Sequence, residues 1–340
     1  MVLSAAASAW LQFAICALLI GVAGTRLSRY GDVIAEKTGM SATWVGLLLM
    51  ATVTSLPELV TGVSAVSLAD APDIAVGNVL GACVINLSML VVLDLLDRGE
   101  SVYTRASQGH ILSAGFGVIL AGFVGANLLF AQHEWVPAIG FIGLYSPFIV
   151  LVYLVAMRTL FRYERRKRAE FVEEKVERYP HVSLRQAYLR YAVAALIVVG
   201  AGVWLPYIGE QLAVAMQWRQ SFVGSLFIAL ATTLPEITVT IAALRLGAVD
   251  LAVSNLLGSN LFNLLILAID DVAYVKGALL SHVSAVHAVS AFSMVMMNGV
   301  VVVGLLYQPR GRVFRTVGWA SLVLLSIYLI NASFLYLYRG

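Results

Sequence analysis

The sequence ATVTSLPE at residues 51–58 returns as ALATTLPE at residues 229–236, with five of the eight positions identical. A second matched pair follows: DIAVGNVLGACVINL at 73–87 and DLAVSNLLGSNLFNL at 250–264 agree at eight of fifteen positions. Two matched segments in the same order, at corresponding places in the two halves of a 340-residue chain, indicate an internal duplication. The repeated motifs therefore span residues 51–87 and 229–264.

The composition around these motifs is that of a membrane protein. Hydrophobic residues make up 60% of the chain, charged residues make up 12%, and the mean hydropathy is +0.89. A water-soluble globule cannot hide that much apolar surface, so the chain is expected to lie in lipid. The net charge of +3 then reflects where a bilayer places arginine and lysine, and it implies no nucleic-acid partner. Cys16 and Cys83 lie in apolar runs, where no structural disulfide is expected.

Ten apolar stretches are long enough to cross the ~30 Å hydrocarbon core, which takes about 20 helical residues. Five precede the only strongly charged segment, residues 162–190, and five follow it. The sequence therefore predicts an all-α membrane protein with a first five-helix half at 1–161, a charged cytoplasmic loop at 162–190 and a second half at 191–340. The predicted spans are 7–25, 41–69, 74–96, 111–131, 136–157, 191–207, 221–244, 251–268, 287–307 and 313–336.

Five is an odd number of crossings, so the second repeat enters the membrane from the side opposite to the first. Transporters built from such inverted repeats bind their ions near the bilayer midplane, where the two motifs meet. With the amino terminus outside, 19 of the 22 basic residues lie on the cytoplasmic side, so both termini are predicted to be extracytoplasmic. The charged loop is expected to be a solvated surface linker, and a regulatory ion site there is the less favoured alternative.

Each motif carries one glutamate, Glu58 or Glu236, in the middle of an apolar helix. A carboxylate there costs at least ~2.5 to 3.5 kcal/mol on insertion scales, and neither motif contains a lysine or an arginine to pair with it. Two such groups brought together repel each other and favour binding of protons or of a cation. A hard divalent cation that prefers oxygen ligands fits their combined charge.

The residues around the glutamates supply neutral oxygens. Pro57 and Pro235 each remove a backbone N–H and loosen the helix, which leaves carbonyl groups of the preceding turn free to face an ion. For the prolines the alternative is a plain helix kink, and for each hydroxyl or amide it is a hydrogen bond within or between helices. The candidate oxygen donors are carbonyls near Ala51, Thr54, Ala229 and Thr232, hydroxyls of Thr54, Ser55, Thr232, Thr233 and Ser259, and amides of Asn86 and Asn263.

Other ionisable residues are predicted to lie outside this site. Asp94 and Asp97 fall near a helix end beside Arg98, which favours a solvated pair, and Asp270 and Asp271 are expected at the membrane interface. The five histidines fall at helix ends or in loops and do not cluster. The sequence lacks HExxH and the other signatures of an intramembrane hydrolase, so the chain is not expected to be an enzyme.

Four segments carry a resemblance to a known family: TSLPEL (54–59), TTLPEI (232–237), GNVLGACVIN (77–86) and SNLLGSNLFN (254–263). Through them the chain resembles the cation/Ca2+ exchanger superfamily, specifically its prokaryotic Na+/Ca2+ exchanger branch. The resemblance implies a secondary active antiporter that exchanges Ca2+ for Na+ at a midplane site, with alternating access through sliding of the first and sixth helices. It implies that Glu58 and Glu236 coordinate Ca2+ together with backbone oxygens of Thr54 and Thr232. Sites for Na+, or sites shared by both ions, are implied at Ala51, Ser55, Asn86, Ala229, Thr233, Ser259 and Asn263.

Three positions depart from the family pattern, because Ala82 stands in place of a serine, Cys83 in place of an asparagine and Asn263 in place of an aspartate. Only two acidic groups remain, which predicts a reduced Na+ stoichiometry or H+ coupling. The alternatives are H+-coupled export of Ca2+ or of another divalent cation such as Mn2+ or Mg2+, and, more remotely, a passive cation channel. No cofactor is expected, the expected location is a prokaryotic inner (plasma) membrane, and the sequence does not indicate an oligomeric state.

Overall fold

The computed structural model describes residues 2–38, 51–97, 101–131, 136–168, 181–308 and 317–338. Its first half contains α1 (Val2–Thr38), α3 (Ala51–Thr54), α4 (Leu56–Ser67), α5 (Pro72–Leu96), α6 (Val102–Arg105), α7 (His110–Phe130), the hairpin of β1 (Ala138–Ile139) and β2 (Ile142–Gly143), and α8 (Tyr145–Arg168). Its second half contains α9 (Leu184–Met216), α10 (Gln220–Phe222), a π-helical turn (Val223–Ile228), α11 (Ala229–Thr232), α12 (Leu234–Arg245), α13 (Val249–Ala273), a 3-10 turn (Leu279–Ser281), α14 (His287–Tyr307) and α15 (Trp319–Leu337).

The described residues contain eight single helices long and apolar enough to cross a membrane, namely α1, α5, α7, α8, α9, α13, α14 and α15. A ninth crossing is formed by the bent pair Gln220–Thr232 and Leu234–Arg245, which turns by 47°. The remaining predicted span, 41–69, includes residues outside the described ones, and its described part is α3 and α4. The prediction of an all-α membrane protein is thus confirmed, with one short hairpin added.

Several predicted span boundaries were wrong. Helices α1 and α9 extend well beyond the predicted spans 7–25 and 191–207, because hydropathy marks only the apolar part of a helix whose hydrogen bonding continues into charged turns. The fifth span begins at Tyr145 and not at 136, since the residues before it form the β1–β2 hairpin. Residues 169–180 of the predicted charged loop lie outside the described ones.

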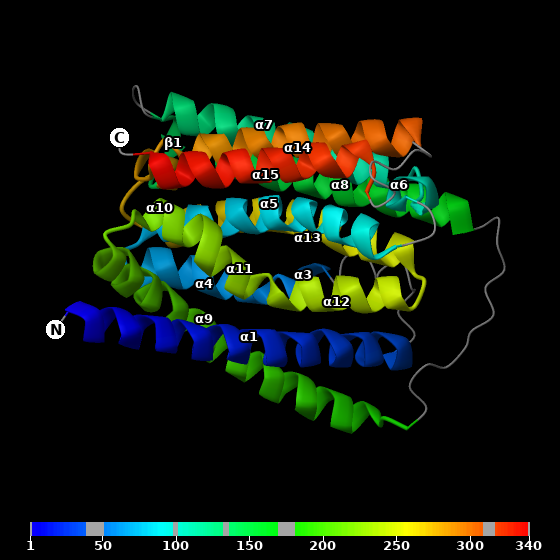
Figure 1. Ribbon diagram of the computed structural model, residues 1–340, viewed down its shortest axis with the longest axis horizontal. Helices are drawn as coiled ribbons and strands as arrows, with labels where there is room; N and C mark the ends of the chain where they lie inside the picture. The colour runs from blue at the N-terminus through cyan, green and yellow to red at the C-terminus, as the bar shows by residue number, and fades with distance from the viewer. Residues whose placement is uncertain are drawn as a thin grey trace.

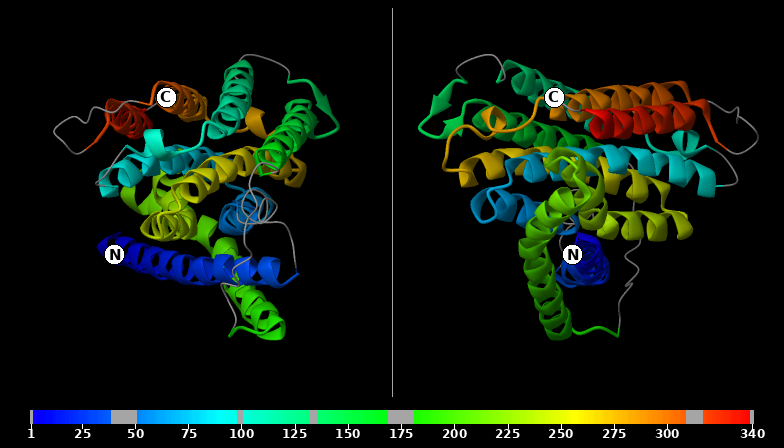
Figure 2. Two further views of the ribbon diagram at one scale, coloured as in Figure 1. Left: turned by 90° about the vertical axis from the view of Figure 1, so that its right-hand side faces the viewer. Right: turned by 60° about the vertical axis from the view of Figure 1, so that its left-hand side comes forward.

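The helices lie side by side along the long axis of the molecule (Figure 1). Helix α9 crosses α1 at one side of the bundle, α7, α8, α14 and α15 lie at the other, and α5 and α13 run between them, as the two turned views also show (Figure 2). Helices α5 and α13 run in opposite directions, and so do α4 and α12 (Figure 1). This is the arrangement that an inverted repeat produces. Helix α1 begins and α15 ends at the same end of the bundle, as an even number of crossings requires.

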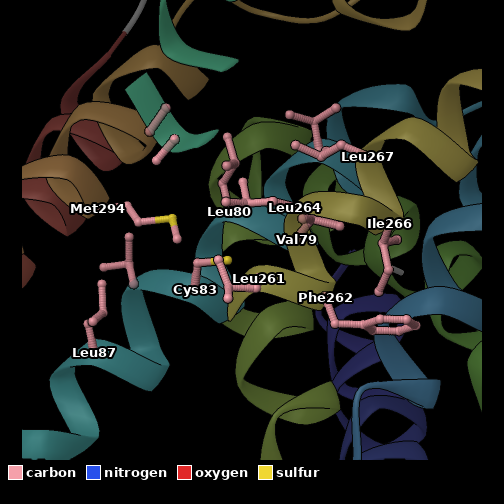
Figure 3. Packing of buried hydrophobic residues seen from close by; sticks show 14 of the residues in the cluster. Val79, Leu80, Cys83, Leu87, Leu261, Phe262, Leu264, Ile266, Leu267 and Met294 are labelled. Atoms are coloured by element: carbon pink, nitrogen blue, oxygen red, sulfur yellow. The ribbon is translucent and has the colours of Figure 1, made fainter. Parts of the chain in front are cut away.

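Buried apolar side chains hold α5 and α13 together in the centre of the molecule. Leu80 and Leu87 of α5 and Leu261 of α13 belong to one cluster, which Met294 of α14 joins from the side (Figure 3). Gly81 brings α5 against the π-helical turn, because a Cβ at this position would overlap the backbone of Ser225. The two helices that carry the second part of each repeated motif are therefore fixed in the protein core.

The starts of α5 and α13 are each joined to the opposite repeat by an aspartate–histidine pair. Oδ1 of Asp73 lies 2.8 Å from Nε2 of His287, at the start of α14. At the equivalent place in the other repeat, Oδ1 of Asp250 lies 3.0 Å from Nε2 of His110, at the start of α7. The two-fold relation between the repeats thus extends to these polar contacts.

The end of α13 is joined to the first repeat by Asp271, which is completely buried. Its carboxylate accepts hydrogen bonds from the backbone N–H groups of Gly143 (2.9 Å) and Leu279 (2.7 Å) and from the hydroxyls of Tyr145 and Ser146. The predicted position of Asp271 at the membrane interface stays a prediction, and within the protein its carboxylate joins the two repeats. Three of its four donors belong to a segment more than 120 positions away in the sequence, and no local pattern indicates them.

The end of α5 repeats this arrangement through Asp94, which is also completely buried. Its carboxylate accepts hydrogen bonds from Ser101 Oγ (3.0 Å), Val102 N (3.2 Å), Gly318 N (2.7 Å) and Ser321 Oγ (2.7 Å). The last two donors lie at the start of α15, in the second repeat. The prediction that Asp94 is solvated was therefore wrong.

Predictions were also made for Asp97, for Asp270 and for the two cysteines. Asp97 forms an ion pair with Arg105, while Arg98, the partner suggested by the sequence, lies outside the described residues. Asp270 is buried within the protein, and its predicted position at the membrane interface stays a prediction. The two cysteines form no disulfide, as predicted, and both are buried.

Candidate functional site

Both repeated motifs interrupt their helix just before the glutamate. The first break is at Ser55, between α3 and α4, and the second is at Thr233, between α11 and α12. Pro57 and Pro235 stand in the first turn of the helix that follows each break, where a missing N–H removes no intrahelical hydrogen bond. The predicted interruption of the helix near each proline is confirmed, while the predicted freeing of the preceding carbonyls is not seen at Ala229, whose carbonyl accepts a hydrogen bond from the backbone N–H of Thr233.

The first turns of α4 and α12 carry Glu58 and Glu236, and both side chains are completely buried. The two broken helices pass each other about halfway along the bundle (Figure 1). The start of a helix carries a partial positive charge that favours a carboxylate, and two ionised glutamates in one centre would repel each other. Within the part of the chain that the structure describes, neither glutamate forms an ion pair with a lysine or an arginine.

Each glutamate is hydrogen-bonded by the break of the opposite repeat. Ser55 Oγ donates to Oε1 of Glu236 at 3.0 Å, and Thr233 Oγ1 donates to Oε1 of Glu58 at 3.3 Å. The second carboxylate oxygen, Oε2, is buried in both residues and has no hydrogen-bond partner among the described residues. Two carboxyl groups thus present one unsatisfied oxygen each, and a bound cation would satisfy both.

Other predicted oxygen donors are buried on the helices of both repeats that meet at this pair. The hydroxyl of Thr54 lies beside Glu236 and 3.3 Å from the hydroxyl of Ser259. The side-chain oxygens of Asn86 and Asn263 are buried, and neither has a hydrogen-bond partner among the described residues. Thr54 lies on α3, Asn86 on α5, and Ser259 and Asn263 on α13, so these four donors come from both repeats.

Two asparagines that were not predicted from the sequence, Asn78 and Asn260, form hydrogen bonds with residues of the candidate site. Asn78 accepts a hydrogen bond from Thr232 Oγ1 at 2.9 Å and donates to the backbone carbonyl of Glu58 at 3.4 Å. Its identity with Asn255 at the same place in the second motif was an available signal. Asn260 accepts a hydrogen bond from Asn86 Nδ2 at 3.0 Å, and no identity between the motifs indicated this residue, because the first motif has a cysteine there.

Three alanines named in the sequence analysis, Ala51, Ala82 and Ala229, lie in or near the repeated motifs as follows. The carbonyl of Ala229 lies 2.6 Å from Thr233 Oγ1 and 3.1 Å from Thr232 Oγ1. Each threonine hydroxyl therefore shares its single hydrogen between this carbonyl and a second acceptor, Glu58 for Thr233 and Asn78 for Thr232. Ala51 is the first residue of α3. Ala82 is completely buried beside Ala229 in a small apolar cluster.

The donor chemistry of this centre is that of a site for hard cations. Among the described residues, no three side chains of histidine, cysteine, aspartate or glutamate converge on a metal position. A cation at this centre would therefore be held by two carboxylates and by neutral hydroxyl, amide and carbonyl oxygens. Such a set suits Na+ or Ca2+ better than a soft metal ion.

The hydroxyls of Ser55 and Thr233, each of which contacts the glutamate of the opposite repeat, are expected to contribute to Ca2+ binding. Ser55→Ala and Thr233→Ala are each expected to raise the Ca2+ concentration for half-maximal uptake about 5- to 10-fold, because each removes one polar oxygen from the carboxylate pair. Uptake of radiolabelled Ca2+ into proteoliposomes measures this. The matched control is Thr238→Ala, whose hydroxyl is exposed on α12 and bonds only its own helix at Leu234 O. Wild-type Ca2+ dependence in the Ser55/Thr233 double variant would contradict the assignment.

Comparison with protein-family models gives one match over most of the chain. The model described as "Sodium/calcium exchanger protein" matches residues 8–154 and 187–337. The chain is 25% identical over 273 residues to the sodium/calcium exchanger MaX1 of Methanosarcina acetivorans, covering 71% of this chain and 76% of that protein. It is 26% identical over 251 residues to the inner membrane protein YrbG of Escherichia coli, covering 73% of this chain and 74% of that protein.

Comparison with solved structures shows the same fold. The sodium-calcium exchanger NCX_Mj, soaked with Na+ and Sr2+, superposes with a TM-score of 0.62 at 19% identity, covering 98% of this chain and 99% of that chain. Native YfkE superposes with a TM-score of 0.66 at 15% identity, covering 96% of this chain and 92% of that chain.

Proposed function

The chain belongs to the sodium/calcium exchanger family, and from this premise we propose that it exchanges Ca2+ for Na+ by alternating access at the Glu58–Glu236 centre. It is a multi-pass membrane transporter of the cation/Ca2+ antiporter class. The proposed substrates are one Ca2+ in one direction and monovalent cations in the other. We place both termini on the extracytoplasmic side of an inner (plasma) membrane, as the distribution of basic residues favours.

The observation that carries this proposal is that the glutamate of each repeat is hydrogen-bonded by a hydroxyl of the other repeat. A glutamate from each repeat is buried without a cationic partner, and its one hydrogen-bonded oxygen is held by a hydroxyl from the other repeat. A passive structural role would leave two unsatisfied carboxylate oxygens in the membrane core. A transported cation supplies the missing charge.

Charge balance supports exchange of one divalent ion for two monovalent ions. The centre contains two carboxylates, because position 263 carries a neutral asparagine amide. One Ca2+ or two monovalent cations neutralise this pair equally well, so either load removes the electrostatic cost of burial. We therefore propose two Na+, or a combination of Na+ and H+, per Ca2+.

The packing of α1 and α9 supports their proposed sliding. The hydrogen bonds of Asp73, Asp94, Asp250 and Asp271 join α5 and α13 to α7, α8, α14 and α15, and none of these bonds involves α1 or α9. Helix α1 lies directly on the second motif, since a Cβ at Gly24 would overlap the ring of Pro235. A sliding α1–α9 pair would therefore uncover the centre from one side and then from the other.

The counter-ion is tested by loading proteoliposomes with Na+ or by imposing an outward H+ gradient and measuring uptake of radiolabelled Ca2+. We expect uptake with Na+ inside and loss of uptake when choline replaces Na+ at constant pH. Uptake that follows only the H+ gradient would assign H+ coupling instead. Competition by Mn2+ and Mg2+ measures divalent selectivity, and stronger competition by either metal than by unlabelled Ca2+ would contradict the proposed substrate.

A further inference from the structure

A third acidic residue, Asp270, is buried in the membrane-spanning part of the molecule outside the centre already described. Its side chain on α13 is completely buried, and neither carboxylate oxygen has a hydrogen-bond partner among the described residues. Its neighbour Asp271, in contrast, uses its carboxylate for four hydrogen bonds. The two adjacent aspartates therefore differ in role, since Asp271 joins helices and Asp270 accepts no hydrogen bond within the part of the chain that the structure describes.

The space that Asp270 occupies is created by a glycine on α4. A Cβ built on Gly62 would lie 2.5 Å from Oδ2 and 2.7 Å from Oδ1 of Asp270. Any larger residue at position 62 would displace the carboxylate. Gly62 therefore allows the carboxylate of Asp270 to lie directly against the backbone of α4. The carboxylate of the neighbouring residue, Asp271, adds electrostatic repulsion to a negative charge on Asp270.

The position of Asp270 continues the line of the central site along two facing helices. Asp270 follows Asn263 by seven residues, which is two helical turns and about 10 Å along the same face of α13. Gly62 follows Glu58 by four residues, about 6 Å along the same face of α4. The contact between Gly62 and Asp270 therefore lies beyond the centre in the direction in which both helices end.

The fold itself does not require an acid at this place. Asp270 stands six residues after Leu264, and the position six residues after Leu87 in the first repeat is Leu93. Leu93 is completely buried as well. Because a leucine fills the equivalent position in the other repeat, packing alone does not explain the aspartate.

The charged groups next along this route are paired with each other. Asp70 follows α4 and Lys276 follows α13, and Lys276 Nζ lies 2.6 Å from Asp70 Oδ1 at the protein surface. The hydrogen bond to Asp70 raises the pKa of the Lys276 ammonium, so this group stays charged. Asp270 thus lies between a polar helix end and the Glu58–Glu236 centre, and a carboxylate buried there needs a proton or a metal cation.

We propose that Asp270 is a third ion-binding carboxylate, an outer subsite that holds a proton when empty and exchanges it for Ca2+ passing between the centre and the ends of α4 and α13. This inference rests on the proposed Ca2+ antiport. It makes the two repeats unequal along the ion path, because the position equivalent to Asp270 in the first repeat is Leu93. By the orientation proposed above, the subsite faces the extracytoplasmic side.

Labelling with dicyclohexylcarbodiimide tests the proposal without measuring transport, because this apolar reagent modifies protonated carboxyl groups in apolar surroundings. The full-length protein is treated in nanodiscs with and without Ca2+, and adducts are located by mass spectrometry. We expect an adduct on Asp270 in Ca2+-free buffer and at least about a fivefold decrease in that adduct with saturating Ca2+. An Asp270 that is not labelled, or whose labelling Ca2+ does not change, would overturn the proposal.

The Glu58→Gln variant separates local binding from a remote effect of the centre. If Asp270 binds Ca2+ itself, Ca2+ still protects it from labelling in this variant, although at higher concentration. Loss of all protection in Glu58→Gln would assign the effect to the centre and overturn the outer subsite.

Transport by Asp270→Asn supplies the second readout, with Glu210→Gln as a control that removes a partly buried carboxylate on α9, outside the proposed route. We expect Asp270→Asn to raise the half-saturating Ca2+ concentration about tenfold while Glu210→Gln changes it less than twofold. Equal Ca2+ dependence of wild type and Asp270→Asn would contradict the subsite. A wild type that moves no Ca2+ would contradict the antiport function instead, so the two failures are distinguishable.

Discussion

Glu58→Gln and Glu236→Gln are each expected to reduce Ca2+ uptake at least about 100-fold, which corresponds to ~2.8 kcal/mol of lost binding. Glutamine keeps the shape of the side chain and its acceptor oxygen, so the hydrogen bonds from Thr233 and Ser55 can persist. What is lost is one of the two negative charges that hold a divalent cation in a medium of low dielectric constant. Uptake of radiolabelled Ca2+ at equal protein density measures the loss.

A matched glutamate-to-glutamine control lies outside the centre. Glu210 on α9 is partly buried and accepts a hydrogen bond from Gln220, and Glu210→Gln is expected to retain uptake within about twofold of wild type. Monodisperse elution of all three variants would show that the fold is intact. Substantial Ca2+ uptake by either Glu58→Gln or Glu236→Gln would remove the two glutamates from the transport site.

Asp271→Ala is expected to lower the stability of the protein by at least about 4 kcal/mol, because four hydrogen-bond donors lose their acceptor and an unsatisfied buried group costs about 1–3 kcal/mol. That is a large part of the 5–15 kcal/mol typical of folded domains. The corresponding decrease in the melting temperature is about 8 °C or more. Size-exclusion chromatography after heating the detergent-solubilised protein in steps measures it.

Asp70→Ala is the control for this measurement, since Asp70 forms one ion pair at the surface, where such pairs contribute little. Asp94→Ala should resemble Asp271→Ala, because Asp94 has the equivalent set of four donors in the other repeat. If Asp271→Ala melted within about 2 °C of wild type, the carboxylate would not be what joins the repeats at this end of α13.

The helical architecture and the identity of the two glutamates could be predicted because each depends on signals within a short stretch of sequence. Apolar length identifies a membrane span, and identity between the two motifs identifies the repeat. The motif also locates the break, because the proline before Glu58 or Glu236 limits where a helix can restart. The boundaries of α1 and α9 were less predictable, since helices continue past the apolar residues that mark them.

The pairing of residues across the centre could not be predicted in the same way. Ser55 and Thr233 were both recognised as oxygen donors, but each serves the glutamate of the other repeat, at a separation of 181 and 175 positions respectively. Such a contact depends on how two antiparallel units assemble, which no single motif specifies. Asn260 was missed for a related reason, because its partner Asn86 lies 174 positions away.

The buried aspartates show the limit of reasoning from position along a helix. Asp94 and Asp271 lie near helix ends, where solvation is the simpler expectation, yet each accepts hydrogen bonds from the opposite repeat, at the start of α15 for Asp94 and in β2 and the start of α8 for Asp271. Both fall seven residues after the matched segments, at equivalent places. Their equivalence was a signal that could have indicated a structural role.

Accumulation of Ca2+ against its own gradient tests the central claim most directly. Proteoliposomes that contain the wild-type protein and Na+ are diluted into Na+-free medium with radiolabelled Ca2+, and the internal Ca2+ concentration is followed. Antiport predicts that internal Ca2+ rises above the external concentration and that an ionophore which collapses the Na+ gradient releases the excess. Ca2+ that only equilibrates across the membrane, with or without the Na+ gradient, would indicate a passive channel and contradict exchange at the Glu58–Glu236 centre.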